Sequence, residues 1–353
     1  MVAKKILWWG RSNIHYSRNQ LLRKLLLDLD FEIIDFYPKL SKLGHIEAWL
    51  RNIVKPDLVW VPCFRHRDIK SASIWCKKNN IPLLIDPLIS SWNKKILENS
   101  KYNISSIKSV KLKKWESTLF SYADLVLADT EIHLNLFKKY LNVPKDKLSV
   151  VYVGADTDKF KPDTQLIQKN YIEVLFYGSF IGLHGADIIV EAAKLLSKYN
   201  NVIWTMLGDG PEHENCLKIS KGAENIQFEK SISYEDLPKR INEADIILGV
   251  FGDSLKASSV IPNKVFQGMA CGKTIITRKS LAYPASFMSK NSGVIQIPPN
   301  DSIALSKAVK SLADNTVFLA KSSLSAKRNF DRFFSQLHVS NQLIKSLRKI
   351  SIS

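Results

Sequence analysis

Short apolar runs alternate with longer helical patterns along the first half of this chain, as in ILWW at 6–9 and LVLA at 125–128. Continuous apolar runs of this length are typical of strands that are buried on both faces of a parallel sheet. The pattern predicts strands at 6–9, 31–36, 57–62, 82–86, 125–128 and 150–153, and helices at 17–29, 69–79 and 130–141, with a long helical basic region up to Ala123. We therefore expect an α/β unit with a doubly wound parallel sheet.

A polar linker at residues 154–168 interrupts this pattern, and the alternation then restarts. It predicts strands at 173–177, 202–207, 226–228, 246–250, 274–277 and 293–297, and helices at 185–199, 234–244, 263–270 and 301–315. We expect two Rossmann-like domains, residues 1–165 and 166–325, that face a central ligand-binding cleft. Residues 326–353 are amphipathic and basic, and they predict a helical tail that can pack back on the first domain.

Metal and disulfide chemistry have little support in the sequence. Asp156 and Asp158 in the linker could form a metal-binding DxD, but no further carboxylate or histidine converges on them, so a solvated connector is favoured. The four cysteines lie far apart without a CxxC pair, which predicts neither a zinc site nor a disulfide framework. We expect no metal, and a reducing cytoplasm fits this cysteine usage best.

The chain is basic, with 51 Lys and Arg residues against 33 Asp and Glu residues. The excess is densest between residues 94 and 114, near Trp92, Tyr102 and Trp115. This stretch could bind an anionic membrane surface or an acceptor, it could bind nucleic acid, or it could be an ordinary solvated surface. No motif that reads RNA or DNA accompanies it, so we expect no nucleic-acid partner. The lysines of a membrane or acceptor surface would be Lys94, Lys95, Lys108, Lys111, Lys113 and Lys114.

No apolar run approaches the roughly 20 residues that span a bilayer. The N-terminal segment MVAKKILWWG is too short for a signal peptide and lacks a small-residue cleavage site, so it predicts a first buried strand. We expect a cytoplasmic protein that can lie peripherally on the inner face of the plasma membrane.

The stretch from Ala244 to Thr277 predicts strand, loop, helix and strand in succession. Pro262 stands where the helix should begin, a position that suits proline because the first-turn N–H has no partner there. Backbone N–H groups and the positive end of the helix dipole would favour an anion at this point, and Lys264 adds a full charge. The stretch therefore predicts an anionic ligand, with an ordinary crossover as the alternative.

Several segments together resemble the donor-binding domain of family-4 glycosyltransferases, which have the GT-B fold. They are YGSFIGLHGADIIVEAAKLL, MLGDGPE, ADIILGVFG and VIPNKVFQGMACGKTII, in this order. ADLVLADTEIHLNLF and VVYVGADTDKFKP are similar to the end of that family's first domain and its linker. IDPLISSW resembles a stretch of a subgroup found in bacterial surface-polysaccharide synthesis.

The resemblance implies transfer of a sugar from a nucleoside diphosphate sugar to a glycan or lipid-linked acceptor, with retained anomeric configuration and without a metal. It implies that His184 and Lys264 stabilise the leaving phosphate. Asp86 would contact the sugar or an acceptor hydroxyl, and His66 and His133 are further candidates. The donor-binding residues that it implies are Gly10, Gly178, Ser179, Gly182, Gly185, Gly208, Asp209, Ile261, Asn263 and Gln267.

Many members of the family have arginine at the position of Ser179 and lysine at that of His184, and two further departures bear on donor binding. The family usually has glutamates where this chain has Gln267 and Ser259, and glutamine loses the charge-assisted bond to a ribose hydroxyl. A noncatalytic nucleotide-sugar-binding scaffold in a glycan assembly complex is therefore the alternative function.

Overall fold

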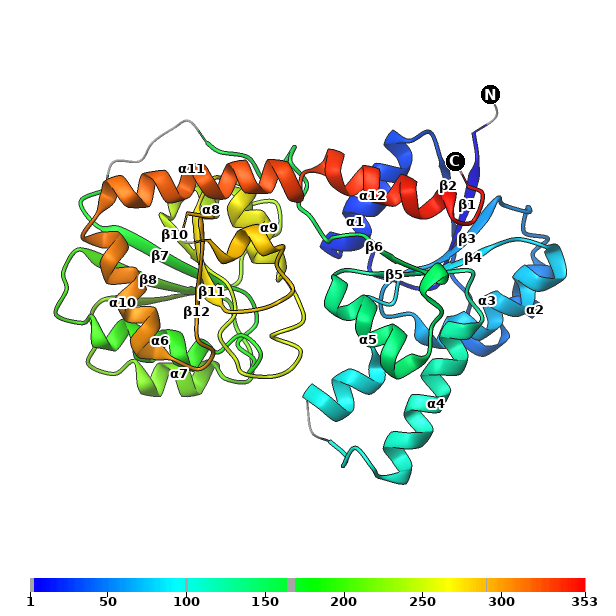
Figure 1. Ribbon diagram of the computed structural model, residues 1–353, viewed down its shortest axis with the longest axis horizontal. Coiled ribbons are helices and arrows are strands. Elements are labelled where there is room, and N and C mark those ends of the chain that lie inside the picture. The colour runs from blue at the N-terminus through cyan, green and yellow to red at the C-terminus, as the bar shows by residue number, and fades with distance from the viewer. Residues whose placement is uncertain (1–2, 99–100, 164–168, 290, 353) are drawn as a thin grey trace. The chain divides into compact units, whose positions relative to one another are not determined.

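The computed structural model describes residues 3–98, 101–163, 169–289 and 291–352 (Figure 1). The chain forms two compact units, Met1–Val153 with Gln336–Ser353, and Gly154–Ser335. Each unit contains a six-stranded sheet in which every described strand pairing is parallel. The expectation of two doubly wound parallel sheets is confirmed.

The first unit has the strand order β2-β1-β3-β4-β5-β6. Its strands are β1 (Lys5–Trp9), β2 (Glu32–Phe36), β3 (Leu58–Val61), β4 (Leu83–Ile85), β5 (Leu125–Ala128) and β6 (Leu148–Val150). Its helices include α1 (Ser17–Asp28), η1 (Ser41–Leu43), α2 (Gly44–Leu50), α3 (His66–Asn79), α4 (Ile107–Ser121), α5 (Glu131–Leu141) and α12 (Gln336–Arg348).

Both faces of this sheet are covered, which explains why its inner strands β3, β4 and β5 are apolar throughout. Along β1, Ile6 and Trp8 join a core that also contains residues of α1 and α12. Leu7 and Trp9 point to the opposite face and pack with residues of α2, α3, α4 and α5. Successive residues of a strand face opposite sides, so a sheet with helices on both faces needs an unbroken apolar run.

The second unit has the strand order β12-β11-β10-β7-β8-β9. Its strands are β7 (Ile172–Tyr177), β8 (Val202–Leu207), β9 (Ile226–Glu229), β10 (Ile246–Leu248), β11 (Thr274–Arg278) and β12 (Val294–Ile297). Its helices include α6 (Ala186–Leu195), α7 (His213–Ile219), α8 (Leu237–Glu243), α9 (Asn263–Ala270), α10 (Ser302–Ala313) and α11 (Thr316–Phe333). Figure 1 shows α6 and α7 on one side of its strands and α9 and α11 on the other.

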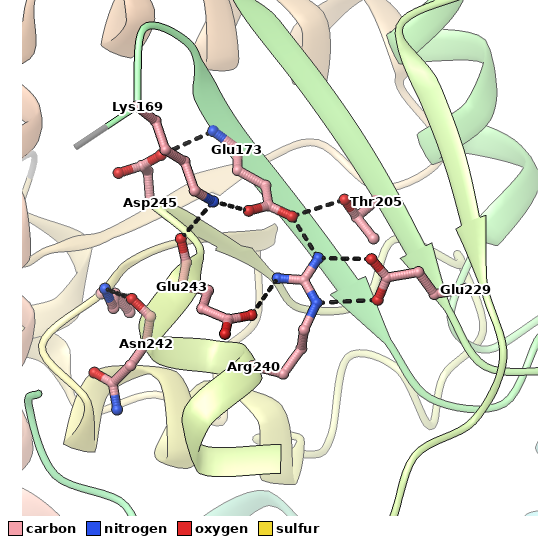
Figure 2. A network of polar contacts seen from close by, with 9 residues as sticks. Lys169, Glu173, Thr205, Glu229, Arg240, Asn242, Glu243 and Asp245 are labelled. Atoms are coloured by element: carbon pink, nitrogen blue, oxygen red, sulfur yellow. Dashed lines mark hydrogen bonds and ion pairs between the residues drawn. The ribbon is translucent and has the colours of Figure 1, made fainter. Parts of the chain in front are cut away.

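A network of charged side chains joins α8 to the second sheet (Figure 2). Arg240 donates to the two carboxylate oxygens of Glu229 at 3.0 and 3.1 Å and also pairs with Glu173. Glu173 pairs with Lys169 as well and accepts a hydrogen bond from Thr205 at 2.8 Å. Each charge in this partly buried cluster therefore has an opposite charge beside it, as burial requires.

The boundaries between the units differ from those expected. The boundary between 165 and 166 falls within residues 164–168, which lie outside the described residues; the compact units divide after Val153 instead. The expected boundary at 325 and 326 falls inside α11, which begins at Thr316 beside the capping residue Asn315 and continues to Phe333. Its apolar residues recur at helical spacing across residue 325, so no break occurs there.

Among the described residues, no helix is both long and apolar enough to cross a membrane.

Candidate functional site

The candidate site lies where the second sheet changes its direction of growth. From β7 the chain continues to β8 and β9 on one side, and it later returns to place β10 on the other side. The loops that follow β7 and β10 therefore separate at the carboxyl edge of the sheet, which is where open α/β sheets bind ligands. The loop after β7 leads to α6, and the loop after β10 leads to α9.

Lys264, in the first turn of α9, is buried at this edge. Its residue is 5% exposed, and its Nζ has no hydrogen-bond partner among the described residues. The amine lies 4.1 Å from the centre of the Phe176 ring, a cation–π distance. Burial lowers the pKa of Lys264 to about 7. An ammonium group without a carboxylate nearby is costly to bury, so this position suits a lysine that receives an anionic ligand.

His184 lies beside the same point. A Cβ atom at Gly178 would lie 3.3 Å from Lys264 Nζ and 3.5 Å from His184 Cε1, so both side chains approach the backbone after β7. His184 Nδ1 is hydrogen-bonded to the carbonyl oxygen of Ser179. A carbonyl only accepts, so the proton is on Nδ1 and the neutral ring carries none on Nε2. Burial, and then the charge of Lys264, lower the pKa of His184 to about 3.

Three glycines hold the loops of this edge together, which gives them a packing role in addition to the expected approach to a ligand. A Cβ at Gly208 would lie 2.2 Å from the oxygen of Gly178, and one at Gly210 would lie 2.6 Å from the nitrogen of Phe180. Gly208 also has a φ of +132°, which side chains rarely adopt. Gly185, with a φ of +63°, precedes α6 and packs against the loop after β10.

Gln267 is buried on α9 with both ends of its amide engaged. Its Oε1 accepts a hydrogen bond from Tyr177 at 2.9 Å, and the side chain also hydrogen-bonds to Tyr234. Ser259 is buried too, and its Oγ donates to the oxygen of Leu255 at 2.7 Å. Tyr177 and Tyr234 were not predicted from the sequence, because one ends a strand and the other lies 33 residues before Gln267. A ribose hydroxyl would therefore use the second lone pair of Oε1 or the second N–H of the amide.

The remaining expected donor residues of this unit are spread around the two loops. Asp209 is mostly exposed, and its carboxylate accepts a hydrogen bond from the nitrogen of Gly210 at 2.6 Å, which is ordinary turn chemistry. Ser179 and Gly182 are exposed, Ile261 is buried just before α9, and Asn263 is the first residue of α9.

Asp86 does not match its expected role. Its carboxylate is fully buried, and both oxygens accept hydrogen bonds from Arg18 Nε at 3.0 and 2.8 Å. A carboxylate in this position holds α1 against β4 and is out of reach of a sugar hydroxyl. Gly10 follows β1 in the same unit, where Arg65 lies 3.1 Å from the point that a Cβ would occupy.

The basic residues of the first unit lie mostly in solvent. Lys113 is half-buried and lies 5.4 Å from the Trp92 ring and 5.5 Å from the Tyr140 ring. The exposed ones are Lys94, Lys95, Lys108, Lys111 and Lys114. Among the described residues, no group of three or more His, Cys, Asp or Glu could hold a metal ion.

Residues 172–315, which contain the Lys264 and His184 site, match the family model described as "Glycosyl transferases group 1". No curated protein matches the chain. Among solved structures, HepE from Anabaena in complex with UDP-glucose is 15% identical, with a TM-score of 0.74 over 98% of this chain and 99% of that chain. A glycosyltransferase from Rickettsia africae is 17% identical, with a TM-score of 0.68 over 100% of both chains.

Sucrose-phosphate synthase from Thermosynechococcus elongatus is 13% identical, with a TM-score of 0.72 over 98% of this chain and 99% of that chain. At such identities these likenesses concern the fold. Together with the two parallel sheets they show that the chain has the GT-B fold, and its second unit carries a domain of the glycosyl transferases group 1 kind.

Proposed function

We propose that this protein is a retaining glycosyltransferase that moves a sugar from a nucleoside diphosphate sugar to a glycan or lipid-linked acceptor in surface-polysaccharide synthesis. The observation that carries the proposal is the buried Lys264 amine, which has no partner among the described residues and lies beside Gly178 at the carboxyl edge of the second sheet. The match of residues 172–315 to a glycosyltransferase family supports it. So do neighbours of the same fold solved with UDP and UDP-glucose. The retaining outcome rests on the sequence resemblance.

In this proposal Lys264 neutralises the diphosphate that leaves as the glycosidic bond breaks. An anion close to the amine raises its pKa, so the lysine is protonated while the donor is bound. Preorganised positive charge at the leaving group lowers the barrier because charge develops there in the transition state. We propose that this lysine neutralises the diphosphate as a metal ion does in other enzymes. A chelator should therefore leave donor binding unchanged.

His184 has a different role from Lys264. Its neutral ring presents Nε2 without a proton, so it accepts a hydrogen bond from a hydroxyl of the substrate or takes up a proton when the diphosphate binds. A cationic His184 before the donor binds does not fit the lowered pKa of its ring.

The test is turnover with a panel of UDP-, GDP- and ADP-sugars, followed by NMR of the released sugar. Slow hydrolysis that retains the anomeric configuration, and that is lost in Lys264→Met, supports the proposal. Lys273→Met is the matched control, since Lys273 is a partly buried lysine of this unit, just before β11, and its amine donates to the carbonyl oxygen of Asn242 at 2.7 Å. Equal turnover by the wild type and Lys264→Met would exclude the role of Lys264.

The noncatalytic scaffold has one specific observation in its favour. The Gln267 side chain already hydrogen-bonds to Tyr177 and Tyr234, so it has fewer hydrogen-bonding positions for a ribose hydroxyl than a glutamate without these partners would have. Saturable donor binding without any turnover would favour this alternative.

We further propose that the exposed lysines of the 94–114 stretch let the protein lie on an anionic membrane. Each lysine near such a surface contributes roughly 1 kcal/mol. Flotation with anionic and neutral vesicles tests this, and equal retention on both would overturn it.

A further inference from the structure

A groove of about 990 Å³ lies on the first unit between α3, α4 and the η1–α2 segment. Basic side chains from all three elements line it: Lys42, His45, Arg67, Lys70, Lys111 and Lys114. Three of these cations, Lys42, Arg67 and Lys70, lie outside the basic stretch at residues 94–114. The fold therefore gathers positive charge from segments far apart in the chain.

No carboxylate lines this groove, and its cations have no ion-pair partner among the described residues. The acidic residues of the same helices are engaged elsewhere. Glu47 pairs with Arg51, Asp68 pairs with Arg65, and Glu116 is buried and accepts hydrogen bonds from the loop after β4. The charged side chains that line the groove are therefore all basic, which favours a ligand that carries several negative charges.

One wall of the groove is apolar. Ile74 and Trp115 line it while remaining 37% and 40% exposed, and Leu119 and Tyr122 complete the wall. A tryptophan that is half in solvent beside lysines suits a ligand that is charged at one end and apolar at the other.

The apolar surface continues along α4. Ile107 precedes Lys111 by four residues and Val110 precedes Lys114 by four, so each shares a face of the helix with a groove lysine. Ile107 is 73% exposed and Val110 is 56% exposed. An apolar chain that leaves the groove therefore meets further apolar side chains.

A second pocket, of about 510 Å³, adjoins the groove and shares Arg67 and Trp115 with it. Its lining includes Phe64 and His66, which follow β3, and Ser91, which follows β4. It thus lies at the carboxyl edge of the first sheet, the edge at which such sheets bind ligands.

We propose that the groove binds the phosphate or diphosphate of an amphiphilic acceptor, with the acceptor's apolar chain against Trp115 and Ile74. The acceptor's sugar end lies in the adjoining pocket. The placement of the sugar end rests on the proposed glycosyltransferase function, whereas the binding of phosphate and apolar chain does not.

The experiment is calorimetric titration of the full chain with three probes: farnesyl diphosphate, inorganic diphosphate and farnesol. We expect farnesyl diphosphate to bind at least tenfold more tightly than either of the others, because only it engages both the cations and the apolar wall. Equal binding of inorganic diphosphate would reduce the groove to a simple anion site and overturn the proposal. Equal binding of farnesol would overturn the role of the cations.

The variant Lys70→Ser with Lys111→Ser removes two exposed groove charges, and we expect it to weaken farnesyl diphosphate binding at least tenfold. Lys55→Ser with Lys138→Ser is the matched control, since it removes the same charge from exposed positions of this unit outside the groove. An equal loss in both variants would mean that net charge, and not the groove, attracts the ligand.

Titration with UDP, GDP and ADP in the same variants separates the two proposals. We expect nucleotide binding to be the same in the wild type and in both double variants. If the wild type binds none of the nucleotides but farnesyl diphosphate binding still depends on Lys70 and Lys111, the proposed function fails and the groove assignment stands.

Discussion

At the residue scale, Lys264 is the side chain whose position is hardest to explain by stability alone. Its amine is buried against the Phe176 ring, and no carboxylate or carbonyl in the described part of the chain receives its hydrogens. An isolated buried charge of this kind destabilises the folded state, and functional sites are where such groups concentrate. The side chains of this site are therefore preorganised for an anion at a cost in stability.

This cost predicts a distinctive pH dependence. The pKa of Lys264 is lowered from 10.5 to about 7 by burial, so between these values the unfolded chain binds more protons than the folded one. The free energy of unfolding then rises with pH, by roughly 2 kcal/mol between pH 7 and pH 9. We expect chemical denaturation to show this rise in the wild type and not in Lys264→Met. Parallel pH profiles for the two proteins would show that Lys264 is not buried as described.

The sequence predicted Lys264 at a helix start because Pro262 marks that start locally. It did not predict the state of His184, which depends on a hydrogen bond to the Ser179 carbonyl. It did not predict the pairing of Asp86 either, because its partner, Arg18, lies 68 residues earlier in the chain. Partners at such separations leave no local signal in one sequence.

At the element scale, long or sharply bounded elements were predicted well. The helix expected at 263–270 is α9 with those bounds, and the strand expected at 202–207 is β8. Two short helices, α2 and α7, were missed, since seven residues hold only two turns of periodic pattern. The strand expected at 150–153 is β6 at Leu148–Val150. Its bounds are set by the residues that pair with β5, and the apolar pattern alone did not locate them.

The network that joins α8 to the sheet gives a prediction at this scale (Figure 2). Burial raises the pKa of Glu173, but hydrogen bonds from Arg240 and Lys169 lower it more, so the net pKa lies below 4.5. The stabilisation by Glu173 is therefore present above pH 4.5 and is lost as the pH falls through the folded-state pKa.

We expect Arg240→Ala to lower the free energy of unfolding by roughly 3–5 kcal/mol at pH 7, because it leaves Glu173 without its main partner. The difference from the wild type should shrink at pH 3. Lys310→Ala is the control, since the pair of Lys310 with Asp314 is exposed and contributes only about 0.3–0.5 kcal/mol. Equal effects of the two substitutions would mean that the network is no stronger than a surface pair.

At the scale of the whole molecule, the C-terminal residues complete the first unit. Val339, Leu343 and Leu347 of α12 pack in the same core as Ile6 and Trp8. The sequence indicated an amphipathic tail and two domains, but the division after Val153 could not be located from it. Where a domain ends depends on which core a helix joins, and periodicity shows only that the helix has an apolar face.

Two leucines of α12 test this arrangement. Leu343 is fully buried and Leu337 is 72% exposed. We expect Leu343→Ala to lower the free energy of unfolding of the first unit by roughly 2–5 kcal/mol and Leu337→Ala to change it by less than about 0.5 kcal/mol. Tryptophan fluorescence reports mainly on this unit, because Trp204 is the sole tryptophan of the second. Indistinguishable unfolding of the two variants would place α12 outside the core.

The central claim is that Lys264 receives the diphosphate of a nucleotide sugar. Calorimetric titration at pH 7 with UDP, GDP and ADP, on the wild type, Lys264→Met and the control Lys273→Met, tests it most directly. We predict that at least one nucleotide binds the wild type and the control equally well, with uptake of protons, and that Lys264→Met weakens its binding at least tenfold. Equal binding of that nucleotide by all three proteins would contradict the account.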